Sequence, residues 1–315
     1  MRVFRSLSHL PSFKNAVITI GTFDGVHQGH QQIIKRINTL AQEYEGESII
    51  VTFDPHPRLV INPADSSLKL LNTLDEKIFL LKKYGVHNVV ITPFSRSFSE
   101  QSAEDYIEFF LVRNFRPKFI VIGYDHRFGK NRSGDIQLLK NLRYRFGYEV
   151  EEIPKATLDA ITISSTKIRH ALAEGNIKIA NELLGHYYSL EGIVTKGLQN
   201  GKKIGYPTAN IHIADPNKLI PRTGVYAVLV HYGENIFGGM LNIGYNPTFG
   251  GKTLSVEVNI LDFNKDIYGE KIKVELVDFV REEIKFANIE LLVEAIHNDK
   301  KNIEKILASV LHANN

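Results

Sequence analysis

The sequence contains no cysteine and no tryptophan, and only two of its 315 residues are methionine. The absence of cysteine excludes disulfide bonds, thiolate metal sites and a cysteine nucleophile, and it is typical of a reducing compartment. No apolar run reaches the ~18 residues that a membrane-spanning helix needs. The first five residues are not followed by the apolar segment of a secretory signal. We therefore expect a cytoplasmic protein without a membrane partner.

An excess of charge of one sign is also lacking. The 38 Lys and Arg residues nearly balance the 35 Asp and Glu residues, and the formal charge of +3 is too small to predict nucleic-acid binding. Hydrophobic residues make up 43% of the chain, which is enough for a sizeable core, and the length favours two domains. We expect small-molecule substrates as partners, and a monomer or weak oligomer.

The first half of the chain alternates strand and helix patterns. Short runs rich in β-branched residues predict strands at 16–20, 48–53, 88–91, 119–122 and 148–151, with helical spacing between them. Parallel strands need crossover connections, so this pattern predicts a parallel sheet with helices on both faces. Ligands of such sheets bind beyond the carboxyl ends of the strands.

Residues 21–30, which read GTFDGVHQGH, form the turn between the first of these strands and its helix. The turn places backbone N–H groups and the imidazoles of His27 and His30 at a helix N-terminus, which favours an anion by ~0.3–1 kcal/mol. A phosphate is the expected ligand. The glycines at 21, 25 and 29 do not match the dinucleotide pattern G-x-G-x-x-G, which favours a transferred nucleotide over bound NAD.

Polar and charged residues that could bind a ligand also follow other predicted strands. His56 lies after the second strand, and Asp125 and Arg127 lie after the fourth. Beyond the fifth, residues 163–169 supply hydroxyl groups at a helix start and Arg169 one turn later. Each segment alone is also explained by an ordinary helix cap or surface turn. Binding of a polyanion explains these three segments together with the turn at 21–30.

The pattern H-x-G-H at 27–30, with ISSTKIR at 163–169, resembles the nucleotidyltransferase superfamily. Residues 21–27, 54–57 and 123–135 extend the resemblance to the FMN adenylyltransferase module of bacterial bifunctional riboflavin kinase/FAD synthetase. The resemblance implies a Rossmann-like domain over residues 1–185, with His27, His30 and Arg169 as catalytic residues. It implies ATP binding by Gly21, Phe23, Asp24, Gly29, Ser165 and Thr166, and nucleotide or flavin positioning by His56, Asp125 and Arg127. Thr22 and His126 depart from the family, which often has asparagine and an aromatic residue there.

The second half of the chain has a different pattern. Short β-type runs at 188–194, 209–213, 224–231, 236–243, 254–260 and 271–279 are separated by glycine and proline turns. Six such strands predict a closed antiparallel barrel, because closure removes unpaired edges. Helical spacing returns from 289 to 311 and predicts a terminal helix.

Residues 197–210 form a glycine-rich segment, GLQNGKKIGYPTAN, that is not a Walker A loop. Its glycine spacing is one residue short, and Lys203 stands where a Ser or Thr should be. Its backbone N–H groups could still wrap phosphates, while Thr208 and Asn210 offer oxygens to Mg²⁺. From spacing alone, an ordinary barrel loop with Thr208 at the start of a strand is the better interpretation.

The segment GYPTAN at 205–210, followed by 224–227, 242–250 and 256–258, is similar to the riboflavin kinase module of the same family. This resemblance implies a kinase domain over residues 186–315, with Glu257 as the catalytic acidic residue and Mg²⁺ bound by Thr208 and Asn210. It implies ATP binding by Gly197, Gly201, Lys202, Gly205 and Pro207, and flavin binding by Arg281 and Phe286.

The two resemblances together imply synthesis of FAD in two steps. Mg²⁺ and ATP would convert riboflavin to FMN, and a second ATP would convert FMN to FAD with release of pyrophosphate. Two alternatives stay open at this point. One is a transferase that moves CMP or AMP onto a pantetheine or nicotinamide precursor, and the other is a flavin-binding sensor or carrier without catalysis.

Overall fold

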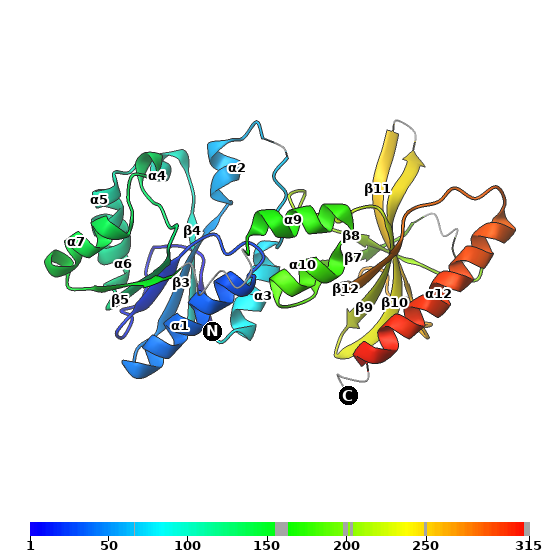
Figure 1. Cartoon of the computed structure of the whole chain (residues 1–315), viewed down its shortest axis with the longest axis horizontal. Helices are drawn as coiled ribbons and strands as arrows, with labels where there is room; N and C mark the ends of the chain where they lie inside the picture. The colour runs from blue at the N-terminus through cyan, green and yellow to red at the C-terminus, as the bar shows by residue number, and fades with distance from the viewer. Residues whose placement is uncertain (66, 155–162, 198–200, 202–203, 249–250, 312–315) are drawn as a thin grey trace. The chain divides into compact units, whose positions relative to one another are not determined.

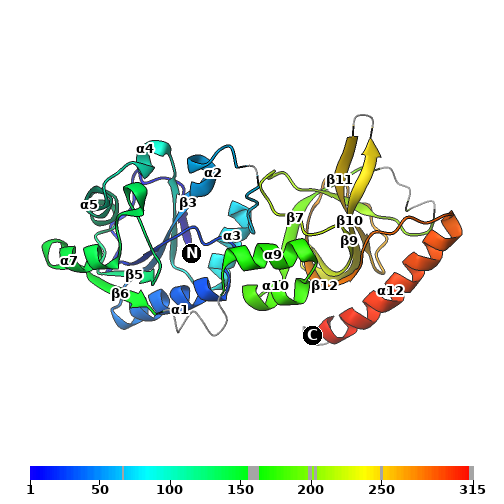
Figure 2. The same cartoon turned by 45° about the horizontal axis from the view of Figure 1, so that its top comes forward.

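The computed structural model describes residues 1–65, 67–154, 163–197, 201, 204–248 and 251–311. The chain forms two compact units, Met1–Ser165 and Thr166–Asn315, which are drawn in Figure 1 and, turned by 45°, in Figure 2. The boundary predicted from the sequence, between residues 185 and 186, lies later in the chain. The assignment of the functional domains therefore stays a prediction.

The first unit contains a six-stranded sheet in the order β1-β4-β3-β2-β5-β6. All neighbouring strands pair in parallel, which confirms the predicted sheet. The strands are β1 (Arg2–Phe4), β2 (Val17–Ile20), β3 (Ser48–Asp54), β4 (Asn88–Pro93), β5 (Phe119–Gly123) and β6 (Glu149–Ile153). After β2 the chain adds strands on one side, and from β5 onward it adds them on the other. The strand order thus changes direction at β2, where parallel sheets bind their ligands.

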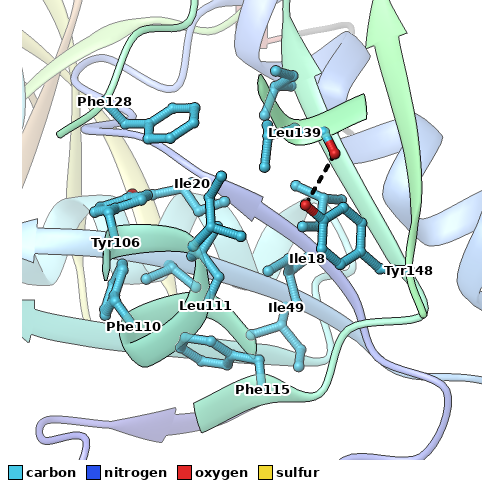
Figure 3. Close-up of a cluster of buried hydrophobic side chains, with 14 of the residues drawn as sticks. Ile18, Ile20, Ile49, Tyr106, Phe110, Leu111, Phe115, Phe128, Leu139 and Tyr148 are labelled. Atoms are coloured by element: carbon cyan, nitrogen blue, oxygen red, sulfur yellow. Dashed lines mark hydrogen bonds between the residues drawn. The ribbon is translucent and has the colours of Figure 1, made fainter. Parts of the chain in front are cut away.

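Helices cover both faces of this sheet because successive residues of each strand point to opposite sides. Ile18 packs in one apolar cluster with Tyr106, Phe110 and Phe115, whereas its neighbour Val17 packs in another, against α1. Figure 3 shows the first cluster, in which the Tyr148 hydroxyl donates to the Leu139 carbonyl at 3.0 Å. The helical segments are α1 (Gln28–Glu43), α2 (Pro57–Ile61), α3 (Leu74–Lys83), α4 (Arg96–Ser99), α5 (Ala103–Asp105), η1 (Tyr106–Val112), α6 (Arg113–Phe115), η2 (Lys130–Arg132) and α7 (Ile136–Phe146).

The second unit is built around a closed antiparallel barrel in the order β10-β11-β8-β7-β12-β9, as predicted. The helix α12 packs on its outer surface, where Ile303 and Leu307 are buried against Val225 and Leu229. None of the helices in the described part of the chain could cross a membrane. The elements are α9 (Ser165–Glu174), α10 (Ile177–Leu184), β7 (Tyr188–Thr195), β8 (Ala209–His212), β9 (Gly224–Tyr232), β10 (Asn235–Thr248), β11 (Gly251–Ile260), β12 (Lys271–Arg281) and α12 (Ile289–Leu311).

The helix α10 is joined to the barrel by side-chain hydrogen bonds. Asn181 donates to the Leu276 carbonyl on β12 at 2.9 Å and accepts from the Tyr188 N–H on β7 at 2.7 Å. The ammonium of Lys178 also lies 2.9 Å from the carboxylate of Asp278. These bonds explain why α10 belongs to the second compact unit, although the sequence suggests no such contact.

A charged cluster joins β9 to β12. The Glu275 carboxylate lies 2.9 Å from the His231 ring and 2.7 Å from the Lys273 ammonium, and its side chain is only 21% exposed. Burial alone would raise the pKa of Glu275, but the hydrogen bonds from His231 and Lys273 lower it to about 2. The folded protein therefore stabilises the charged form of the Glu275 carboxylate relative to the unfolded chain.

We expect Glu275→Gln to lower the free energy of unfolding at pH 7 by about 1–3 kcal/mol. Because the folded pKa lies below the usual value of 4.5, this stabilisation is complete above pH 4.5 and is lost as the pH falls toward 2. Thermal unfolding at pH 7 and pH 3 measures it, with the exposed Glu270→Gln as control. The difference between the Glu275 variant and the parent should at least halve at pH 3. An equal difference at both values would contradict the prediction.

Candidate functional site

The turn between β2 and α1 lies at the point where the strand order of the first unit reverses. Its backbone is unusual, since Phe23, Gly25 and Val26 have φ angles of 49°, 88° and 41°. Only glycine adopts such left-handed angles without cost, and a β-branched residue such as Val26 does so rarely. Both Phe23 and Val26 are buried, so packing holds the turn in this conformation.

Asp24 fixes this turn from within. Its side chain is 2% exposed, and one carboxylate oxygen accepts from the backbone N–H groups of Leu71 at 2.9 Å and Asn72 at 3.4 Å. Its backbone carbonyl accepts from the Ser165 hydroxyl at 2.9 Å. The structure thus brings the predicted residues Asp24 and Ser165 together. Gly21 packs beneath the ring of Phe23, and a Cβ added at Gly21 would lie 3.2 Å from that ring.

The two predicted histidines stack on each other. The ring centres of His27 and His30 are 3.7 Å apart with an angle of 15° between the planes, and the Phe23 ring lies 4.9 Å from His30. The backbone N–H of His30 donates to the ring atom Nδ1 of His27 at 3.4 Å, so the His27 side chain caps the start of α1. A neutral His27 then carries its proton on Nε2, which makes that atom a hydrogen-bond donor. Gly29 is buried in the first turn of the helix between them.

His30 is held in its neutral form. Burial lowers its pKa well below the usual 6.5, and the positive charges of His27 and Lys77 lower it further. Its Nδ1 atom is buried without a hydrogen-bond partner among the described residues. A buried polar atom of this kind is costly unless a ligand or water pairs with it. His30 is therefore equipped to donate or accept a hydrogen bond and not to act as a cation.

The other predicted residues of this region lie near strand ends. His56 follows β3, and its ring accepts from the Arg58 N–H at 3.2 Å, so it caps α2. Asp125 and Arg127 are exposed after β5, where Arg127 forms an ion pair with Asp135 at 2.7 Å. The remaining two, Thr166 and Arg169, lie on α9 in the second unit. The roles assigned to all five residues stay predictions.

A polar row crosses the barrel of the second unit. Glu257 on β11 pairs directly with Asn242 on β10 and with Asn210 on β8, and Asn210 pairs with Thr195 on β7. Side chains directly opposite one another across a ladder lie on the same face of the sheet. The Thr208 hydroxyl donates to the Glu257 carboxylate at 3.2 Å. The three residues predicted for metal binding and catalysis, Thr208, Asn210 and Glu257, are thus gathered in one place.

The glycine-rich segment runs beside this row. Gly197 lies so close to Asn210 that an added Cβ would require the Asn210 side chain to move. The Gly201 carbonyl accepts from the N–H groups of Ile204 at 3.2 Å and Tyr206 at 2.8 Å. Gly205 and Pro207 are exposed, and Asn259 donates to the Pro207 carbonyl at 2.7 Å. Lys202 lies outside the described residues.

Arg281 and Phe286 contact each other, with the guanidinium carbon 5.7 Å from the ring centre. Arg281 also donates to the carboxylate of Asp299 on α12, the shortest of these bonds being 2.7 Å. Asp299 is buried, so this pair attaches the end of β12 to the terminal helix. The predicted part of Arg281 and Phe286 in flavin binding stays a prediction.

Four residues of these sites, Asn259, Asn242, Thr195 and Lys77, were not assigned a role from the sequence. Glu257 and Asn259 stand two apart among Val256, Val258 and Ile260, and this alternation could have pointed to Asn259. Asn242 and Thr195 join the row only through strand register. Lys77 belongs to an ordinary amphipathic helix pattern, and nothing in the sequence marks it as buried.

Comparisons with known proteins divide the chain in two. A family model described as FAD synthetase matches residues 10–167, and one described as riboflavin kinase matches residues 184–307. A bifunctional riboflavin kinase/FMN adenylyltransferase of Listeria monocytogenes is 37% identical over 94% of this chain and 94% of its own length. The protein of the same description from Escherichia coli K12 is 35% identical over 95% of each chain.

A solved structure from Streptococcus pneumoniae is also similar. It covers 95% of this chain and 97% of its own, with a TM-score of 0.85 and 32% sequence identity, and its title describes a macrolide-efflux protein. The similarity extends over both units of the fold.

We expect the ring signals of His30 to show no protonation between pH 8 and pH 6, because burial and neighbouring positive charge hold its pKa well below 6.5. Two-dimensional NMR of the imidazole groups measures this, with the signal assigned by its loss in His30→Asn. A midpoint at or above pH 6.5 would contradict the geometry described above.

Proposed function

We propose that each unit catalyses one of two consecutive reactions, because the chain belongs to the bifunctional riboflavin kinase/FMN adenylyltransferase family. The enzyme converts riboflavin to FMN and FMN to FAD. The assignment of the reactions to particular residues is our proposal. It rests chiefly on one observation, which is that each unit gathers its own separate set of polar side chains.

In the second unit, the 5′-hydroxyl oxygen of riboflavin attacks the γ-phosphorus of ATP. The new O–P bond gives FMN, the bond to the β-phosphate oxygen breaks to release ADP, and Glu257 accepts or orients the hydroxyl proton. The hydrogen bond from Thr208 fixes the direction of that carboxylate. A carboxylate is a weak base at neutral pH, and this suffices because phosphoryl transfer depends mainly on positioning and charge neutralisation.

The donor atoms of this site suit Mg²⁺. Thr208, Asn210 and Glu257 offer oxygens, and within the described ranges no three His, Cys, Asp or Glu side chains form a metal cluster. Mg²⁺ favours such sites, with few protein ligands and the rest supplied by water and phosphates. When bound by Thr208 and Asn210, it would neutralise the charge of the phosphates. We assign ATP binding to Gly197, Gly201, Lys202, Gly205 and Pro207, and flavin binding to Arg281 and Phe286.

In the first unit, a phosphate oxygen of FMN attacks the α-phosphorus of a second ATP. The bond between the α-phosphorus and the bridging oxygen breaks and pyrophosphate leaves, so no covalent enzyme intermediate is needed. His27 and His30 hold the triphosphate through their ring nitrogens and stabilise the charge that develops on it. We assign the same task to Ser165 and, on the family resemblance alone, to Thr166 and Arg169, which lie just beyond the end of this unit. We assign nucleotide or flavin positioning to His56, Asp125 and Arg127. Gly21, Phe23, Asp24 and Gly29 shape the ATP-binding turn.

Four further features of the protein remain proposals. We place the enzyme in the cytoplasm, as a monomer or weak oligomer that does not bind nucleic acid, on the grounds of its lack of cysteine and its near-balanced charge. We also keep the functional boundary between residues 185 and 186.

The double variant His27→Ala/His30→Ala should lower FAD formation from FMN by at least about 10²-fold, because the ATP phosphates lose their imidazole hydrogen-bond partners. Riboflavin should still be converted to FMN, which would accumulate. Product chromatography measures both compounds, and the exposed His170→Ala serves as control. Loss of both activities in a folded double variant would reject the division of labour.

Glu257→Gln should have the opposite effect. It should slow riboflavin phosphorylation by about 10²–10³-fold, because the amide cannot accept the proton. The conversion of added FMN to FAD should stay within about twofold of the parent. The matched control is Glu234→Gln in the exposed turn between β9 and β10. Unchanged kinase activity would reject the role of Glu257.

A further inference from the structure

A lysine without an assigned role lies buried beneath the turn of the first unit. Lys77 on α3 is 6% exposed, and its ammonium donates to the Thr52 hydroxyl on β3 at 3.4 Å. The same hydroxyl donates to the Thr22 carbonyl at 3.2 Å. A hydroxyl group can accept one hydrogen bond and donate another. A continuous path of hydrogen bonds therefore runs from α3 through β3 to the turn that leads to His27 and His30.

The charge of this lysine is balanced locally. Burial lowers the pKa of Lys77, while the negative charges of Asp24 and Asp54 raise it in part. A buried ammonium is costly unless it is paired, so these two carboxylates explain how the chain tolerates it. Asp24 is the residue that also ties the turn to Leu71 and Asn72. The positive charge of Lys77 thus interacts with the carboxylate of Asp24, which supports the turn.

We propose that Lys77 is a positioning residue for adenylyl transfer, which fixes the turn that leads to His27 and His30 through its hydrogen bond to Thr52. The inference rests on the function proposed for the first unit. It adds a residue that neither the histidine pattern nor the family comparison assigns.

The surroundings of His30 explain why Lys77 matters. His27 faces it from the start of α1, Phe23 faces it from the turn, and Lys77 acts on it from α3. Removal of the Lys77 charge would leave the negative charges of Asp24 and Asp54 without the positive charge that offsets them. The local potential would then become more negative and would favour a proton on His30. A charged His30 beside His27 would repel its neighbour and disturb the stacked pair.

Four variants of the full chain test the inference. Lys77→Met and Lys77→Gln remove the charge, Lys77→Arg keeps it, and Lys83→Met removes an exposed lysine from the same helix. NMR titration of the His30 ring should show the midpoint about one to two pH units higher in the Met and Gln variants than in the parent. It should be unchanged in Lys83→Met and should stay low in Lys77→Arg.

The pH dependence of FAD formation from FMN and ATP gives a second readout. The rate of the Met and Gln variants should fall more steeply than that of the parent as the pH is lowered from 8 to 6, and their rate at pH 7 should be about tenfold or more below that of the parent. Riboflavin phosphorylation by the same samples should be unchanged, which shows that the chain is folded. Lys77→Arg should recover most of the rate.

Three outcomes would overturn the inference. The first is an unchanged His30 midpoint in a folded Met or Gln variant, and the second is a slower rate without any change in the pH profile. The third is failure of both neutral variants to fold, which would make Lys77 a purely structural residue. A different result would instead reject the proposed function. In that case the His30 midpoint would move as expected, but His30→Asn would leave FAD formation intact.

Discussion

The buried carboxylate of Asp24 is the interaction on which the first unit depends. It accepts from the N–H groups of Leu71 and Asn72, and the carbonyl of the same residue accepts from Ser165. These bonds connect the turn after β2 with the segment before α3 and with Ser165, the last residue of the first unit. They hold Phe23 and Val26 in left-handed conformations that those residues would otherwise avoid. The stacked histidines follow directly, so their geometry depends on this carboxylate.

In the second unit, strand register holds the polar side chains in place. Antiparallel pairing places Asn242, Glu257 and Asn210 side by side, and the closed barrel leaves no edge at which that register could slip. Thr208 then needs only one hydrogen bond to join the row. A rigid barrel is well suited to phosphoryl transfer, which relies on positioning more than on acid and base strength. Each unit thus offers its own preorganised polar groups for the reaction that we propose for it.

The sequence predicted both architectures because their signals are local. Period-two and helical patterns predicted the strands and helices, and the resemblance of the H-x-G-H and PTAN segments to a known family predicted the two sites. Pairing between distant segments was not accessible in this way. The burial of Lys77, the contact of Asn259 with Pro207 and the packing of α10 on the barrel arise from tertiary structure. Strand β1, with three largely exposed residues, also lacks any pattern that would identify it.

Following single phosphorus atoms through the enzyme tests the proposed two-step synthesis most directly. The purified chain would be incubated with riboflavin, Mg²⁺ and ATP labelled at either the α- or the γ-phosphorus, and the flavins would be separated over time. The γ-label should enter FMN first and then FAD, whereas the α-label should enter FAD alone, together with release of unlabelled pyrophosphate. An α-label in FMN, or flavin that is bound but never converted, would contradict the account.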